Sequence, residues 1–132
     1  MRYELNRDIK KRDEILFGRY DPQAYMGGIR RFQDLQPSVL NRLIDEGFVN
    51  IDDAQNSSPT IEELLDFAER FPGFYTFDGY VVSDKRSDYR LSIDSIRRTP
   101  AYIDDREELL QFVDLARYAD EANFGAGDAW WD

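Results

Sequence analysis

The chain has 132 residues, 42% of them hydrophobic, which is enough apolar material for the core of one domain. It contains no cysteine and no histidine, so disulfides, thiolate metal sites, Ser-His-Asp hydrolysis and the usual zinc centres are excluded. The formal net charge is −10, and such a surface repels the phosphate backbone of nucleic acids.

The acidic residues are concentrated in two segments. Residues 32–71 carry two Lys/Arg against nine Asp/Glu, and residues 99–132 carry the same numbers. No run of about 18 apolar residues could cross a bilayer, and the first residues have no apolar stretch typical of a signal peptide. We therefore expect a cytoplasmic protein without a membrane partner.

The first half of the chain predicts three helices and one short turn. Asn6 can cap a helix over residues 6–17, which Gly18 ends, and Asp21-Pro22 begins one or two further turns. The second helix covers residues 37–46 and stops at Gly47. The third begins with Ser58 as its cap and Pro59 at its first position, and its apolar residues recur at helical spacing as far as Phe71.

Extended segments and a last helix follow. Residues 74–83 and 89–96 predict a hairpin, in which Gly79 indicates a bulge or a close backbone approach. Residues 101–103 are expected to add a short extended piece. Asp104 and Glu107 match a capping box, and the helix that follows should continue to about Ala122. Gly125-Ala-Gly127 then predicts a flexible exit.

Together these elements predict an α+β fold with a small antiparallel sheet centred on one hairpin and packed against three or four helices. Residues 1–124 form the single domain, and residues 125–132 form a short C-terminal tail. A two-stranded hairpin is marginal by itself, so the sheet must pack on helices or gain a strand. A second copy of the chain, joined at a sheet edge, could supply that strand.

The hairpin and the helix before it have the order of a winged helix, but two observations argue against DNA binding. The connection over residues 47–58 is far longer than a helix-turn-helix allows, and the helix after it is strongly acidic. At the hairpin tip, Asp84 and Asp88 flank Lys85 and Arg86, so the local charges cancel. We therefore expect no direct nucleic-acid binding.

No motif identifies a catalytic residue, a cofactor or a metal site. The oxygen-rich segment 50–56 lacks the glycine and the glutamate of a calcium loop, because Gln55 and Ile61 stand at those positions. Carboxylate or tyrosine chemistry remains open to an enzyme, and the acidic segments leave open a nucleic-acid mimic that occupies a basic groove on a partner. By exclusion, the chain is interpreted as a protein-binding or regulatory module.

Four residues are the candidates for contact with another protein. Lys85 and Arg86 lie at the expected hairpin tip, where a partner could reach them. Trp130 and Trp131 lie in the tail, where they either pack on their own domain or enter a pocket of the partner. Packing on the domain is the favoured reading of the two tryptophans.

Overall fold

The computed structural model describes residues 4–132 and contains one five-stranded antiparallel sheet. Its strand order is β1-β2-β3-β5-β4, so β1 and β4 are the outer edges and any strand from a second copy would have to be added there. The strands are β1 (Ile29–Leu35), β2 (Tyr75–Val82), β3 (Leu91–Arg98), β4 (Glu121–Asn123) and β5 (Asp128–Trp130).

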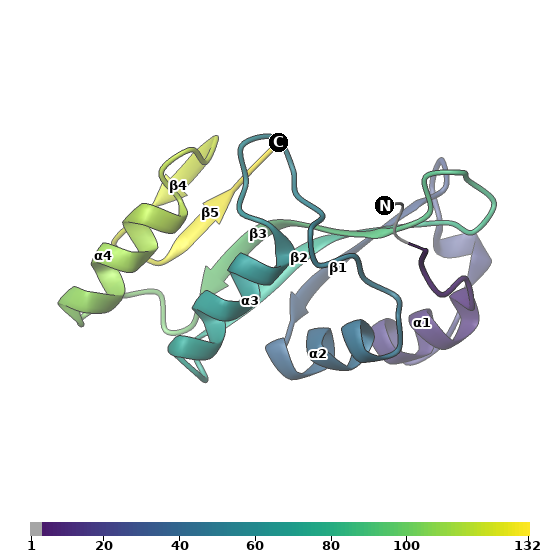
Figure 1. The fold of residues 1–132 in the computed structure, drawn as a ribbon, viewed down its shortest axis with the longest axis horizontal. Coiled ribbons are helices and arrows are strands. Elements are labelled where there is room, and N and C mark those ends of the chain that lie inside the picture. Colours follow the sequence, from purple (N-terminus) through teal and green to yellow (C-terminus); the bar gives the residue numbers. More distant parts are fainter. Residues whose placement is uncertain (1–3) are drawn as a thin grey trace.

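Four α-helices line the sheet (Figure 1). Three of them lie along one face, and the fourth continues the row beside β4 and β5. The predicted α+β class is thereby confirmed. The helices are α1 (Ile9–Phe17), α2 (Pro37–Asp45), α3 (Ile61–Arg70) and α4 (Arg106–Leu115), with a 3-10 turn, η1 (Pro22–Ala24), between α1 and β1.

Three helices begin later than the sequence predicts, because a better-placed side chain caps each one. Asp8, and not Asn6, caps α1 by accepting a hydrogen bond from the backbone N–H of Lys11. Thr60, and not Ser58, caps α3 in a full capping box with Glu63. Asp105 caps α4 through the backbone N–H of Glu108. In all three cases the cap lies next to the first hydrogen-bonded turn, where its oxygen reaches the free amides.

The segment before α4 is not a strand, contrary to the prediction for residues 101–103. The position beside β3 is occupied by β5, which pairs Ala129 with Ile96 and Trp130 with Ser95. The backbone of the segment is satisfied elsewhere, since Ile103 donates to the carbonyl of Gly125 and Tyr102 accepts from the guanidinium of Arg98.

The end of the chain also differs from the prediction. α4 stops at Leu115, and residues up to 122 do not continue it, because Glu121–Asn123 form β4. The glycines at 125 and 127 lie in the connection between β4 and β5, and Gly127 has a φ of 75°. The last residues are therefore part of the sheet.

The core fills the space between the sheet and its helices. Phe77, Val81, Leu91 and Ile93 point from the central strands toward the helices and are buried. Gly79 lies at a register shift of β2, and a Cβ there would be 2.0 Å from the carbonyl oxygen of Ser92. The predicted bulge and the predicted close approach are both present.

Candidate functional site

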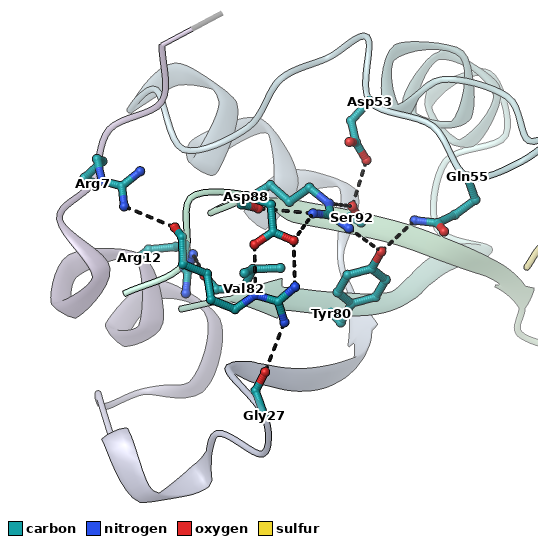
Figure 2. Close-up of polar contacts among 11 residues, drawn as sticks. Arg7, Arg12, Gly27, Asp53, Gln55, Tyr80, Val82, Asp88 and Ser92 are labelled. Atoms are coloured by element: carbon teal, nitrogen blue, oxygen red, sulfur yellow. Dashed lines mark hydrogen bonds and ion pairs between the residues drawn. The ribbon is translucent and has the colours of Figure 1, made fainter. Parts of the chain in front are cut away.

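The hairpin tip carries Lys85 and Arg86, as predicted, but Arg86 is already occupied. Its guanidinium donates to both carboxylate oxygens of Asp88 at 2.8 and 2.7 Å and to the carbonyl of Gly27 at 3.0 Å (Figure 2). Lys85 is exposed, and no ion pair within residues 4–132 includes it. Asp84, the residue before Lys85, also has no ion pair within residues 4–132, so the tip carries one unpaired charge of each sign.

A small hollow of about 350 Å³ lies at this tip. Lys85, Arg86 and Ser83 form one side of it, and the segment around η1 forms the other with Tyr20 and Tyr25. Arg86 closes the space next to Gly28, where a Cβ would lie 2.5 Å from the Cδ of Arg86. Among the residues that line the hollow, Lys85 is a cation that no ion pair within the described chain, residues 4–132, engages, and its long side chain is exposed.

A polar cluster crosses β2 and β3 next to the tip and fastens the loop 46–60 to the sheet (Figure 2). Arg90 and Gln55 donate to the hydroxyl of Tyr80 at 2.9 and 3.1 Å. Ser92 donates to Asp53 at 2.9 Å and accepts from Arg90 at 3.0 Å. Two side chains of the loop are thereby bonded to two strands.

Titratable groups in this cluster are shifted in ways that its contacts explain. Burial raises the pKa of Asp53 and outweighs the hydrogen bond from Ser92. Burial would also raise the pKa of Tyr80, but the hydrogen bonds from Gln55 and Arg90 lower it below its ordinary value. Shifted groups that converge are candidates for chemistry.

The geometry of the cluster argues for a structural use. Ser92 is fully buried, and its hydroxyl is bonded on both sides by Asp53 and Arg90. A substrate would have to displace these contacts, since the hollows of about 350 and 570 Å³ in this structure are lined by other residues. The cluster acts as a fastening between the loop and the sheet.

The two tail tryptophans have different surroundings. Trp131 is buried within the core, and its backbone N–H donates to the carbonyl of Asp94 at 2.9 Å. Trp130 is 38% exposed on β5. Because β5 pairs with β3 at Ser95 and Ile96, the tail lies several strand residues from the hairpin tip. The structure does not bring the four candidate residues into one surface.

Two buried clusters of an arginine, a carboxylate and a tyrosine hold the helices to the sheet. In the first, Arg98 of β3 donates to both oxygens of Glu108 in α4 at 2.6 and 3.2 Å. Tyr75 donates to the same carboxylate at 2.6 Å. Arg98 also donates to the carbonyls of Pro100 and Tyr102. This Arg98 cluster fixes α4 against the end of the sheet.

The second cluster lies at the hairpin end and holds α1. Arg12 donates to Asp13 at 3.0 Å, to the carbonyl of Val82 at 3.1 Å and to the hydroxyl of Tyr25 at 2.8 Å. Tyr25 in turn donates to Asp13. Arg12 and Asp13 are both fully buried, so this Arg12 cluster is a structural ion pair with its hydrogen bonds completed by neighbours.

A groove of about 570 Å³ lies between α3 and α4, which run side by side in opposite directions (Figure 1). Each helix presents one stripe of residues to it. The spacing of both stripes is i, i+3, i+4 and i+7, which puts the residues on one helix face. The stripe of α3 is Glu63, Asp66, Phe67 and Arg70, and that of α4 is Glu107, Leu110, Gln111 and Asp114.

Apolar and acidic side chains are combined in this α3–α4 groove. Leu110 is 55% exposed and Tyr118, just beyond α4, is 65% exposed. Asp66 and Glu107 form no ion pair within residues 4–132. Arg70 spans the groove by donating to Gln111. The groove is thus a shaped surface with unused apolar and negatively charged groups.

The sequence did not single out this surface. Its signal was present as two helical stripes that mix carboxylates with large apolar residues, but each stripe by itself is typical of a solvated helix face. The packing of Phe112 against Phe67, whose ring centres are 5.9 Å apart, and the hydrogen bond from Arg70 to Gln111 bring the stripes together.

Comparison with known proteins supplies no relative: no family model matches the chain, and no curated protein or solved structure does. Within residues 4–132, no helix is both long and apolar enough to cross a membrane. The same residues contain no group of three or more acidic side chains placed to hold a metal ion. The cytoplasmic location stays a prediction from the sequence.

Proposed function

We propose that this protein is a protein-binding module and that the α3–α4 groove receives its partner. The observation that supports this proposal is the exposure of Leu110 and Tyr118 in a hollow of about 570 Å³. Large apolar side chains in a concave surface with a polar rim are typical of sites for other proteins. Trp130, at the exposed side of β5, is a further candidate contact.

The alternatives have less support in the geometry. Enzyme chemistry would use the cluster that contains Tyr80 and Asp53. The polar groups of this cluster form hydrogen bonds within the cluster and do not face an open cavity. A nucleic-acid mimic needs an uninterrupted array of carboxylates, but Arg70 and Arg117 stand in the groove among them. Arg117 is paired with Asp114 at 2.5 Å.

Site-specific photo-crosslinking tests the proposal. A photoreactive phenylalanine analogue replaces Leu110 in one version of the chain and Tyr102, which is 65% exposed and does not line the groove, in another. In extract of the native host, we expect a discrete crosslinked protein from position 110 and none from position 102. Tyr118→Ser, introduced into the position 110 version, should reduce that product severalfold because it removes a wall of the groove.

The control also defines failure. Equal products from both positions would indicate nonspecific contact. The absence of any product from position 110 would show that the groove does not receive a protein partner in that extract. In either case the proposal would be wrong.

A further inference from the structure

We infer that the occupant of the α3–α4 groove is a basic amphipathic helix of about three turns. The inference rests on the proposed function and adds the chemical class of the partner. It follows from three properties of the groove: its shape, the exposure of its apolar residues and the sign of its unpaired charges.

The shape of the groove fits one helix. α3 and α4 have ten residues each, and a ten-residue helix is about 15 Å long. The loop residues Ser57 and Pro59, which precede α3, also line the groove. A helix laid between two antiparallel helices packs side chains into the spaces between their stripes. About 10–12 residues of a partner would fill this length.

The apolar contacts define one face of the partner. Leu110 and Tyr118 project from the α4 side, and Leu115 contributes a partly buried surface between them. Phe67 lies beneath, fully buried. Leu110 lies within α4 and Tyr118 lies just beyond its end, so a partner helix with apolar residues repeated over successive turns, as in an i, i+4, i+7 pattern, would contact both.

The charges define the flanks of the partner. Four carboxylates line the groove, those of Glu63, Asp66, Glu107 and Asp114, against two guanidinium groups. Asp114 is paired with Arg117, and Glu63 belongs to the capping box of α3. Asp66 and Glu107, one on each wall, have no cation partner within residues 4–132, and they outnumber Arg70, which lines the groove without a carboxylate partner in those residues. Complementary charge favours lysine or arginine on both flanks of the incoming helix, while an acidic helix would be repelled.

Two synthetic peptides test this class directly. Both have 14 residues with leucine at the same helically spaced positions, and the polar positions carry lysine in one peptide and glutamate in the other. Binding is measured by isothermal titration calorimetry with the full chain. We expect the lysine peptide to bind, with an affinity that falls as salt is raised, and the glutamate peptide not to bind.

Matched variants separate the groove from general attraction to an acidic protein. Asp66→Asn with Glu107→Gln removes two charges from the groove, and Asp45→Asn with Asp104→Asn removes two exposed charges elsewhere. We expect the groove pair to weaken the affinity for the lysine peptide about tenfold and the control pair to weaken it less than about twofold. Circular dichroism checks that both variants are folded.

A second pair of variants tests the apolar contact. Tyr118 and Tyr102 are both 65% exposed, but only Tyr118 lines the groove. Tyr118→Ser should weaken the affinity for the lysine peptide at least about fivefold, whereas Tyr102→Ser should leave this affinity unchanged.

Each outcome bears on the inference. Equal weakening by the groove and control pairs, equal binding of the two peptides, or no binding of the lysine peptide would overturn it. If the lysine peptide fails while the crosslink from position 110 persists, the partner is a protein of another kind and the proposed function stands. If that crosslink also fails, both are wrong.

Discussion

The two ends of the sheet are held by the same chemical arrangement, but the arrangements support different surfaces. At each end a buried arginine binds a carboxylate that also accepts a hydrogen bond from a tyrosine. The Arg12 cluster joins two neighbouring residues of α1, Arg12 and Asp13, to Val82 of β2 beneath the hairpin tip. The Arg98 cluster joins β3 to α4, so the α3–α4 groove depends on it.

The surfaces above the two clusters also differ in which charged and apolar side chains remain without a partner. At the hairpin tip Arg86 is satisfied by Asp88 and Gly27, and the adjacent Asp84 and Lys85 carry opposite charges. In the groove, Leu110 and Tyr118 are exposed and Asp66 has no cation partner within residues 4–132. A region whose groups satisfy one another stabilises the fold, whereas a region that leaves them unused is available to a partner.

The largest effect is expected from Arg98→Met. This change leaves Glu108 buried without its cation and removes four hydrogen bonds that the guanidinium donates. Loss of one partner of a buried pair costs about 3–5 kcal/mol, a large part of the stability of a domain this size. Urea unfolding measures the loss.

The double variant Arg98→Met with Glu108→Leu provides the control. It replaces the buried charges by apolar groups of similar size, so we expect it to recover most of the lost stability. If the single variant were as stable as the parent protein, the Arg98 cluster would not hold α4.

Arg12→Met should cost somewhat less, about 3 kcal/mol. The guanidinium of Arg12 donates three hydrogen bonds, and Asp13 keeps the one from Tyr25 after the change. Because this cluster lies at the opposite end of the sheet, the folded variant should still bind the lysine peptide with unchanged affinity. Once circular dichroism has confirmed that the variant is folded, calorimetry measures its affinity for the lysine peptide. Reduced affinity would contradict the separation of the two ends of the sheet.

The tyrosines of the two clusters should titrate differently from Tyr80. Burial, together with the neighbouring carboxylate, raises the pKa of Tyr25 and of Tyr75 above the ordinary value of 10.0, while Gln55 and Arg90 lower the pKa of Tyr80 despite its burial. Absorbance near 295 nm should therefore show that Tyr80 ionises at lower pH than Tyr25 and Tyr75, and the difference between the parent protein and Tyr80→Phe should isolate this early step.

The sign for stability follows from these directions. A raised pKa in the folded state means that Tyr25 and Tyr75 contribute stability fully below about pH 10 and lose it as the pH rises further. Tyr80 contributes in the opposite sense, so its stabilisation appears as the pH rises toward 10. If Tyr80→Phe left the early step in place, the hydrogen bonds of its hydroxyl would not be those described.

Local patterns in the sequence were sufficient for the elements whose causes are local. The amphipathic spacing of α3, the left-handed stop at Gly18 and the bulge at Gly79 are confirmed. Thr60 was missed as the cap of α3 because Ser58 followed by Pro59 gives the stronger local signal. The true first turn is decided by the reciprocal bonds with Glu63.

Contacts between distant segments were not accessible from local patterns. Glu108 reads as a solvated residue of α4, but it is buried because Arg98, ten residues earlier, is directed at it. Residues 128–130 carry no strand signal of their own and become β5 by pairing with Ser95 and Ile96. The groove required the same kind of information, since its two walls are about 40 residues apart in sequence.

The smallest effect is expected at the hairpin tip. Arg86→Ala removes bonds to Asp88 and to the carbonyl of Gly27, all on partly exposed groups. Exposed ion pairs are screened by water and lose side-chain entropy on forming, so their net contribution is small. Asp88 also keeps its contact with Arg90 at 3.1 Å. The urea midpoint and the affinity for the lysine peptide should both stay within error of the parent protein. A clear loss of peptide affinity would mean that the tip takes part in recognition, and the contrast between a satisfied end and an available end of the sheet would no longer hold.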